Sequence, residues 1–528
     1  MGAALNGDIA SNQKTYNKME KKKWSKYQEA IFEFIKDGKG SLVVNAVAGS
    51  GKTTTIVECA QIARKNKLSV LFLAFNKSIA TELGQRMDGT GVACKTLHSH
   101  GYRAIMRKLG RSVVLNYDKW KNYIDDNADT FLECQEFDSD AERASYVRDI
   151  LKLLNLARIN LIEKVDDEEL EALNELAEHH GIDVDDNQIS IVNDILGICY
   201  RTDEEIDFTD MITLPVVCDK IRKALPKYDI VFVDEAQDLS KAQRELVLAS
   251  LEKGGRFVAV GDKKQAINGF AGADVVSFNT LSEIAGNELP LSVCYRCGKT
   301  IVEEAQGIVP YIQYFENAQD GLVRHAKDLT SVEIGDMILC RKTAPLIGVC
   351  LRLIANGTPA LVKGRDIADG LKSMISRSKA KTISALENKL QKEIDKVERK
   401  VIKKGYDGTL EEQPAVIAIR DKVDCIMMIA DNCTSVDEVM ERVERLFSDT
   451  QDGRVVTLST VHKAKGLEAD NAFIICPNIL PMRRKQQQEW ELEQEMNLKY
   501  VAITRAKKCL TYVDVDEDKL PKVALPKV

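Results

Sequence analysis

A glycine-rich turn at residues 46–54 constrains the fold more than any other stretch of this sequence. It reads Ala-Val-Ala-Gly-Ser-Gly-Lys-Thr-Thr, follows an apolar run at 42–44 and precedes a helical pattern at 55–60. A strand, a glycine turn and a helix start in this order are typical of a P-loop, whose backbone N–H groups close around phosphate oxygens. The usual first glycine of that pattern is replaced here by Ala46. The sequence therefore predicts an α/β fold with a nucleoside triphosphate site.

The residues of this turn have distinct predicted tasks. Gly49 and Gly51 carry no Cβ, so the backbone can approach phosphate closely. Lys52 is expected to neutralise the β- and γ-phosphates, and the Thr53 hydroxyl to bind Mg²⁺. An ordinary glycine turn is the competing interpretation, and the strand–turn–helix context argues against it. The predicted phosphate-binding set is Ala48, Gly49, Ser50, Gly51, Lys52, Thr53 and Thr54.

Composition limits the class of protein without deciding its function. With 528 residues, 44% hydrophobic and 29% charged, the chain fits a soluble multidomain protein. No apolar run approaches the ~18 residues of a membrane span, and thirteen scattered cysteines favour a reducing, cytoplasmic setting. One Cys-x-x-Cys, Cys294 and Cys297, has no second pair, which argues against zinc. The net charge of −7 does not by itself indicate nucleic-acid binding, although a local groove can still be basic.

Apolar runs recur along the chain in two groups. The first group lies at 42–44, 70–74, 230–233 and 257–260, and the second at 337–340, 360–362, 455–458, 472–475 and 509–513. Short buried strands alternating with helices predict two doubly wound parallel sheets. The charged stretch 385–404 fits either a coiled-coil arm or, preferably, a solvated helix. We predict a first core at 1–104 and 226–290, a helical insertion at 105–225, a second core at 291–365 and 451–528, and a short helical insertion at 366–450.

An acidic pair, Asp234 and Glu235, follows the apolar run at 230–233. Such a pair is often only a solvated turn. A buried strand before it and a P-loop upstream favour a catalytic interpretation. We therefore expect Asp234 to position Mg²⁺ and Glu235 to act as general base on the attacking water.

Further stretches lie in a set order along the chain. They are residues 234–238 (Asp-Glu-Ala-Gln-Asp), 261–270, 291–296, 460–468 and 500–506. Together with the P-loop, this series resembles the motifs of UvrD/Rep/PcrA-type superfamily 1 helicases. The resemblance extends from Gln28 to Lys507, and the two insertions match by position only. It implies two RecA-like cores, each interrupted by a mainly helical insertion, and ATP with Mg²⁺ as cofactors.

The resemblance also implies roles at the base and ribose of the nucleotide. Gln28 would read the adenine edge, Tyr295 would stack on the base and Glu468 would bond the ribose.

At the γ-phosphate, Gln265 would act as a sensor, and Arg296 and Arg505 as arginine fingers. A missing arginine finger typically costs ~10³–10⁵ in rate. Lys52 and Glu235 lie on the first core and the two arginines on the second. The site would therefore be complete only when the cores close, which ties hydrolysis to a domain movement.

A translocase must also bind the nucleic-acid strand along which it moves. Aromatic stacking on a base is worth ~1–3 kcal/mol and tolerates any sequence, which suits a translocase. Core packing is the competing interpretation for the aromatic residues. Asn268 and Ala271 stand where helicases of this type often have an aromatic residue and an arginine, which predicts a weaker grip on DNA. The expected DNA contacts are Phe75, Asn76, Lys77, Thr96, His98, Phe270, Thr460 and His462.

The leading hypothesis is an ATP-dependent DNA helicase and translocase that acts on single-stranded DNA and at junctions with duplex, with 3′→5′ polarity implied by the family. The alternative is an ATP-controlled nucleic-acid-binding motor or regulatory subunit that unwinds nothing. RNA remains open as a track, because backbone and stacking contacts do not distinguish the sugars. We expect no membrane association, and protein partners would bind through the helical insertions.

Overall fold

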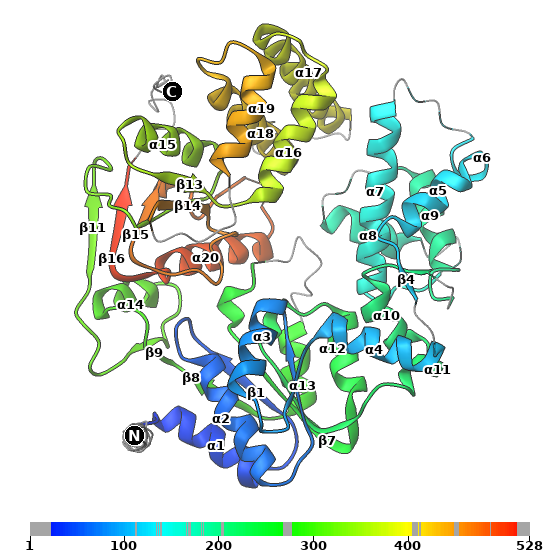
Figure 1. Ribbon diagram of the computed structural model, residues 1–528, viewed down its shortest axis with the longest axis vertical. Coiled ribbons are helices and arrows are strands. Elements are labelled where there is room, and N and C mark those ends of the chain that lie inside the picture. The colour runs from blue at the N-terminus through cyan, green and yellow to red at the C-terminus, as the bar shows by residue number, and fades with distance from the viewer. Residues whose placement is uncertain are drawn as a thin grey trace, which may run out of the picture.

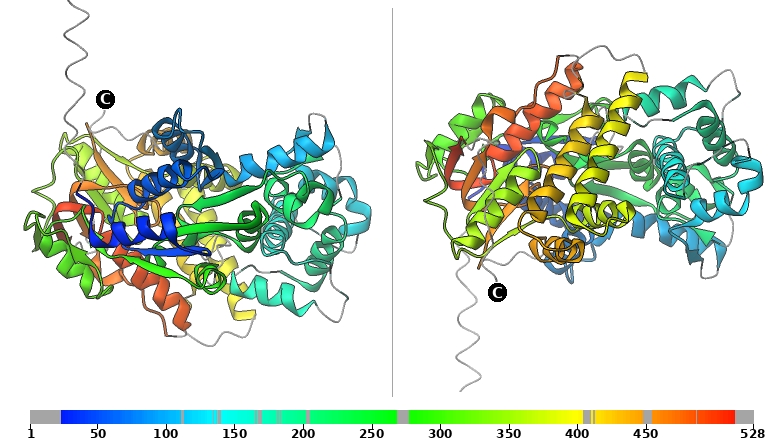
Figure 2. Two further views of the ribbon diagram at one scale, coloured as in Figure 1. Left: turned by 90° about the horizontal axis from the view of Figure 1, so that it is seen from below. Right: turned by 90° about the horizontal axis from the view of Figure 1, so that it is seen from above.

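The computed structural model contains two parallel sheets, and a helical group projects from each of them (Figure 1). In both views of Figure 2, the helices of the first insertion lie at the end opposite to the second sheet. The structure describes residues 23–514 apart from 111–112, 134, 136, 138–139, 165, 167–169, 181, 183, 202–204, 268–276, 404–409, 411–412, 448–453 and 486.

The first sheet has the strand order β3-β2-β6-β7-β1-β8, and all its neighbouring strands are parallel. Its central strands are apolar and buried, as expected where helices cover both faces of a parallel sheet. The strands are β1 (Leu42–Ala46), β2 (Val70–Ala74), β3 (Ala93–Thr96), β6 (Tyr228–Val233), β7 (Leu251–Gly261) and β8 (Glu288–Leu291). The helices of this core are α1 (Lys26–Asp37), α2 (Lys52–Lys65), α3 (Lys77–Arg86), α4 (Leu97–Leu109), α12 (Lys241–Ala249) and α13 (Ser277–Ala285).

The first insertion is mainly helical and has its own apolar cluster, which includes Trp120, Leu153 and Val192. Helix α4 runs across residue 104, where the sequence placed the end of the first core segment. The elements that follow it are β4 (Val114–Leu115), α5 (Lys119–Asp126), α6 (Ala128–Phe131), α7 (Asp140–Ile159), α8 (Glu171–His179), α9 (Asp186–Leu196), β5 (Glu205–Ile206), α10 (Asp210–Val217) and α11 (Asp219–Arg222).

The second sheet has the strand order β11-β16-β15-β12-β14-β13 and is also parallel throughout. A short parallel pair, β9 with β10, leads into it from the first core. The strands are β9 (Val293–Cys294), β10 (Gln313–Tyr314), β11 (Leu322–Ala326), β12 (Met337–Cys340), β13 (Ala360–Val362), β14 (Val456–Thr460), β15 (Ala469–Ile475) and β16 (Ala506–Val513). The helices are α14 (Lys299–Gln306), α15 (Ala344–Ala355) and α20 (Glu489–Ile503).

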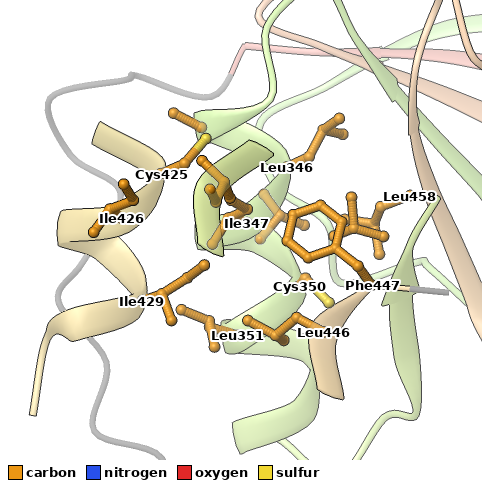
Figure 3. Close-up of a cluster of buried hydrophobic side chains, with 14 of the residues drawn as sticks. Leu346, Ile347, Cys350, Leu351, Cys425, Ile426, Ile429, Leu446, Phe447 and Leu458 are labelled. Atoms are coloured by element: carbon orange, nitrogen blue, oxygen red, sulfur yellow. The ribbon is translucent and has the colours of Figure 1, made fainter. Parts of the chain in front are cut away.

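The second insertion packs onto the second core through a continuous apolar cluster (Figure 3). Leu346 and Ile347 of α15 belong to it together with Ile426 of the insertion and Phe447, which follows the insertion's last helix. The stretch that sequence analysis treated as an arm or a solvated helix is a long helix with one buried stripe that joins the same cluster. The helices are α16 (Arg365–Ser378), α17 (Ile383–Lys403), α18 (Pro414–Ala430) and α19 (Val436–Leu446).

The predicted α/β class with two parallel sheets and helical insertions is confirmed. Two details differ from the sequence interpretation. Edge strands β8 and β11 were not predicted, because exposed residues interrupt both of them and neither shows a clear apolar run. Strand β7 begins earlier than residue 257, since its first half is also exposed and polar. Among the described residues, no helix combines the length and the apolar character that crossing a membrane requires.

Candidate functional site

The P-loop joins β1 to α2 and has a backbone that favours glycine. Gly49 has a φ of +65° and Gly51 a φ of +77°, both in the left-handed region. A Cβ on Gly49 would lie 2.6 Å from the Cβ of Arg296 and 3.0 Å from the sulfur of Cys294. Position 49 therefore needs glycine for its backbone conformation and also because the second core approaches it so closely.

The acidic pair at the end of β6 lies beside the P-loop, as its position after a parallel strand predicts. The Lys52 ammonium is 3.6 Å from a Glu235 carboxylate oxygen, and the Thr53 hydroxyl donates to Asp234 at 3.4 Å. The Ser50 hydroxyl is buried and has no hydrogen-bond partner in the structure. An unpaired hydroxyl, a cation and a hydroxyl–carboxylate pair fit a triphosphate with Mg²⁺, which prefers oxygen ligands.

Burial and neighbouring charges set the protonation of this group. Burial, followed by the charge of Glu235, raises the pKa of Asp234 to about 7. Burial works in the same direction on Glu235, but the cations Lys52 and Lys465 outweigh it and lower its pKa. Burial would lower the pKa of Lys52, yet Glu235, Asp262 and Asp234 together raise it. At neutral pH, the site therefore holds an ionised Glu235 beside a charged lysine, and Glu235 can accept a proton from water.

A chain of amide and carboxylate contacts joins Glu235 to the end of β7. The Gln237 amide donates to Glu235 at 2.6 Å, and its oxygen accepts from the backbone N–H of Asp262 at 3.0 Å. Gln265 donates to the Asp262 carboxylate at 2.7 Å. The predicted γ-phosphate sensor thus lies in the network that contains the predicted base.

Both predicted arginine fingers lie where the second core meets the P-loop. The Arg296 guanidinium pairs with Glu468 at 2.7 Å, and Lys507 binds the same carboxylate at 2.6 Å. Arg505 is 1% exposed, and its guanidinium donates to the carbonyl oxygens of Val501 and Leu467 at 3.0 and 2.9 Å.

The electrostatics place both arginines close to the catalytic candidates. Burial, and then the neighbouring charge of Arg296, lowers the pKa of Arg505 to about 10. The charge of Arg505 also acts on Glu235, and the charge of Arg296 acts on Lys52. The structure therefore brings the two arginines to the P-loop side of the second core.

The predicted base-binding residues also lie together. The Gln28 amide donates to the Thr55 hydroxyl at 3.0 Å, and the Tyr295 hydroxyl donates to Gln28 at 3.5 Å. The backbone N–H of Tyr295 donates to the Gly49 carbonyl at 2.9 Å. The exposed ring of Tyr295 lies 5.1 Å from that of Phe315, so an aromatic face is open beside the P-loop. In contrast, the predicted ribose ligand, Glu468, is paired with cations.

Two second-core residues at this site had no role assigned from sequence. The Tyr500 hydroxyl accepts from the Ala48 N–H of the P-loop at 2.8 Å and donates to the Asp262 carboxylate at 3.3 Å. The Lys465 ammonium binds Asp238 at 2.5 Å and the Gln265 carbonyl at 2.8 Å. Both residues belong to motif stretches named above, at 460–468 and 500–506. The motifs indicated a functional role for these stretches but did not predict contacts between the two cores.

On the first core, the predicted DNA contacts follow β2 and β3. Phe75 is 40% exposed, and the Asn76 side chain caps α3, which begins at Lys77, by accepting from the Ile79 N–H at 2.9 Å. Thr96 caps α4 in the same way, by accepting from the Ser99 N–H at 3.1 Å. These residues therefore build the two loop-to-helix turns at this sheet edge.

An aromatic stack that sequence analysis missed lies beside these turns. His98 stacks on Phe208 with 3.9 Å between ring centroids, and Tyr117 lies 6.5 Å from Phe208. Burial lowers the pKa of His98 to about 4, so its ring is neutral at pH 7. Phe208 and Tyr117 are exposed, and the only sequence signal for them was an aromatic residue between polar ones.

Phe208 is held outward by a buried ion cluster. Its neighbours Asp207 and Asp210 bind the guanidinium of Arg158, each at 2.5 Å. Because both carboxylates turn inward, the phenyl ring between them stays at the surface, next to His98.

The remaining predicted contacts fall on the second core or outside the described residues. Thr460 is largely buried at the end of β14, and its hydroxyl accepts from the Lys463 N–H at 3.4 Å. Burial, followed by the charges of Arg341 and Lys463, lowers the pKa of His462 to about 3, so this ring is also neutral. Phe270 lies outside the described residues, as do Asn268 and Ala271.

Comparison with known proteins gives two matching family models. The UvrD/REP helicase N-terminal domain matches residues 25–285, and the UvrD-like helicase C-terminal domain matches residues 163–515.

Several curated proteins are also similar to this chain. F-box DNA helicase 1 of Gallus gallus is 26% identical over 89% of this chain and 47% of its own length. F-box DNA helicase protein 1 of Schizosaccharomyces pombe is 24% identical over 96% of this chain and 59% of its own length. ATP-dependent DNA helicase PcrA of Staphylococcus aureus is 25% identical over 52% of this chain and 39% of its own length. The chain spans about half the length of the curated relatives it matches.

Proposed function

Because this chain belongs to the UvrD/REP helicase family, we propose that it is an ATP-driven motor that moves 3′→5′ along single-stranded DNA and separates duplex strands. The observation that carries the proposal is a single buried site supplied by both cores. Lys52 and Glu235 come from the first core, and Arg296 and Arg505 from the second. The charges that complete the site belong to both cores, so ATP hydrolysis is coupled to their relative movement.

Each residue acts on a different part of the nucleotide. Lys52 and the P-loop N–H groups hold the β- and γ-phosphates, while Arg296 and Arg505 stabilise the charge that develops as the γ-phosphoryl is transferred. Glu235 accepts the proton of the attacking water. Thr53 and Asp234 would hold Mg²⁺, which would neutralise part of the phosphate charge when bound.

The base and ribose fit the opposite end of the site. Tyr295 offers an exposed ring for stacking, and Gln28 offers amide groups for the edge of adenine. Glu468 bonds the ribose after exchanging one of its cation contacts.

The DNA track crosses the two turns that end β2 and β3. Asn76, Lys77 and Thr96 contact the phosphate backbone there, and Phe75 provides a stacking surface. Phe270, which lies outside the described residues, is proposed as a second stacking contact. On the second core, Thr460 and His462 hold the next stretch of strand. His98 contributes a neutral ring, which stacks on Phe208 and suits contact with bases more than ionic contact with phosphate.

A second candidate function rests on Asn268 and Ala271. The family often has an aromatic residue and an arginine at these positions, so this chain has fewer stacking and charge contacts there. With a weaker grip, the protein would act as an ATP-controlled nucleic-acid-binding or regulatory subunit without unwinding. In either case, it works inside the cell, and the helical insertions are the surfaces offered to protein partners.

Polarity and substrate can be tested together. ATP hydrolysis is measured with single strands of DNA and of RNA, at two salt concentrations because phosphate contacts weaken with salt. Unwinding is measured on duplexes with a 3′ or a 5′ tail. We expect stimulation by DNA strands and unwinding from the 3′ tail. Unwinding only from a 5′ tail would overturn the polarity, and stimulation without strand separation would favour the second function.

A further inference from the structure

The predicted function leaves unused a pair of thiols that flanks two of its nucleotide-site residues. Cys294 ends β9, residues 295–297 form a bend, and Cys297 precedes α14. Both cysteines are buried, and they stand three residues apart, one at each end of this bend. Tyr295 and Arg296 lie between them in the chain. A covalent bond between the two sulfurs would therefore act directly on both residues.

The environment makes the two thiols chemically unequal. The hydrogen bond from the Cys297 thiol lowers the pKa of Cys294; burial opposes this, and the backbone N–H groups of Cys297 and Arg296 and the Arg296 charge assist it. The same hydrogen bond, together with burial, raises the pKa of Cys297. A stabilised thiolate beside a protonated thiol is the arrangement of reactive Cys-x-x-Cys pairs.

Two other buried cysteines, Cys59 and Cys350, differ from this pair. Burial raises the pKa of each thiol above its ordinary value, so both stay protonated at neutral pH. A thiolate reacts with oxidants and a protonated buried thiol does not, so oxidation should select Cys294 over these two.

The pair is also packed into the seam between the cores. The Cys294 sulfur lies 3.0 Å from the place of a Cβ on Gly49, and the Cys297 sulfur lies 3.8 Å from the Thr504 carbonyl oxygen. A disulfide holds its sulfurs at about 2.05 Å with a restricted torsion angle, so the bend must reorganise when the bond forms. Tyr295 and Arg296 would move with it.

We propose that Cys294 and Cys297 form a reversible disulfide that switches off the nucleotide site. The switching part rests on the proposed ATPase function, whereas formation of the disulfide does not.

The reaction balances with a hydroperoxide as oxidant. The Cys294 thiolate attacks one oxygen of hydrogen peroxide, and hydroxide leaves, giving a sulfenic acid. The Cys297 thiol then attacks that sulfur; the S–S bond forms, and the sulfenic hydroxyl leaves as water with the thiol proton. Overall, two thiols lose two electrons and two protons, and one peroxide becomes two waters. A small dithiol such as dithiothreitol reverses the step by thiol–disulfide exchange.

The test treats the full-length reduced protein with hydrogen peroxide. Peptide mapping after alkylation measures the disulfide, and ATP hydrolysis is measured before and after dithiothreitol. Cys297→Ser removes the resolving thiol, so Cys294 should stop at the sulfenic acid, which a sulfenic-acid-selective reagent detects. Cys509→Ser is the matched control, because Cys509 is half-buried on β16 and its sulfur lies 3.6 Å from the Thr511 hydroxyl.

We expect the 294–297 disulfide in the wild type and in Cys509→Ser, with a reversible fall in hydrolysis of about 10²-fold, the cost of misplacing catalytic groups by about 1 Å. No disulfide at peroxide doses that oxidise Cys509 would overturn the proposal. A disulfide without loss of hydrolysis would overturn the switch. If the reduced protein hydrolyses no ATP, the proposed function fails. Peptide mapping still shows whether the 294–297 disulfide forms, and nucleotide binding then shows whether that disulfide changes the site.

Discussion

Replacing Gly49 by alanine tests the contact between the P-loop and the second core. The added Cβ would lie 2.6 Å from the Cβ of Arg296 and 3.0 Å from the Cys294 sulfur. Carbon atoms pack at about 3.5–4.0 Å, so the segment that bears Arg296 must retreat by about 1 Å. The left-handed backbone at Gly49 adds a strain of about 1–2 kcal/mol for any residue with a Cβ.

The two effects can be separated with a control variant. Gly254 has a φ of +81° and nothing within 4 Å of an added Cβ, so Gly254→Ala carries the strain without the clash. We expect the two variants to lose similar stability, since each places alanine in a left-handed conformation. We expect only Gly49→Ala to lose turnover, by about 10²-fold, as for a 1 Å misplacement of catalytic groups.

The assay is steady-state ATP hydrolysis at saturating nucleotide and single-stranded DNA, with urea unfolding to compare stability. Equal turnover in Gly49→Ala and Gly254→Ala would contradict this expectation. It would mean that the seam beside Arg296 is not part of the catalytic geometry.

Three further outcomes are expected. Glu235→Gln should bind ATP but hydrolyse it far more slowly, in single-turnover measurements, because the amide cannot accept the water proton; substantial residual hydrolysis would identify another base. Phe208→Ala should weaken single-strand binding by ~1–3 kcal/mol at unchanged basal hydrolysis, and unchanged affinity would return this ring to a purely structural role. The pKa values of His98 and His462 are lowered to about 4 and about 3, chiefly by burial, from an ordinary 6.5. The unfolded chain therefore binds more protons at these two rings below that value, and their contribution to the free energy of unfolding should fall as the pH drops from 7 to 5, whereas Asp234, with its raised pKa, contributes in the opposite sense; a His98→Gln variant whose urea midpoint changes with pH as that of the wild type does would contradict this.

Short-range patterns were enough to predict the P-loop and the acidic pair. Strand, turn and helix signals lie within a few residues of Lys52, and Glu235 directly follows an apolar strand. Parallel strands deliver such residues to one sheet edge, so their proximity follows from the fold class. The placement of Arg296 and Arg505 was expected only through the resemblance to a family, because nothing local in the sequence connects them to the P-loop.

The remaining features depend on tertiary packing. Tyr500 reaches the Ala48 N–H across the seam, and no periodic pattern encodes a contact between residues so far apart. Phe208 stacks on His98 only because Arg158 draws its acidic neighbours inward. Strand β11 was not predicted because an exposed edge strand can form without the apolar run by which strands were recognised.

In the proposed mechanism, the second core completes the ATP site of the first through Arg505. Arg505→Ala should bind nucleotide while single-turnover hydrolysis falls by ~10³-fold or more, as expected for a lost arginine finger. Lys508→Ala removes a nearby cation that is 58% exposed and paired with Asp470, and should hydrolyse ATP like the wild type. If Arg505→Ala hydrolysed ATP as fast as Lys508→Ala, the composite site would be contradicted.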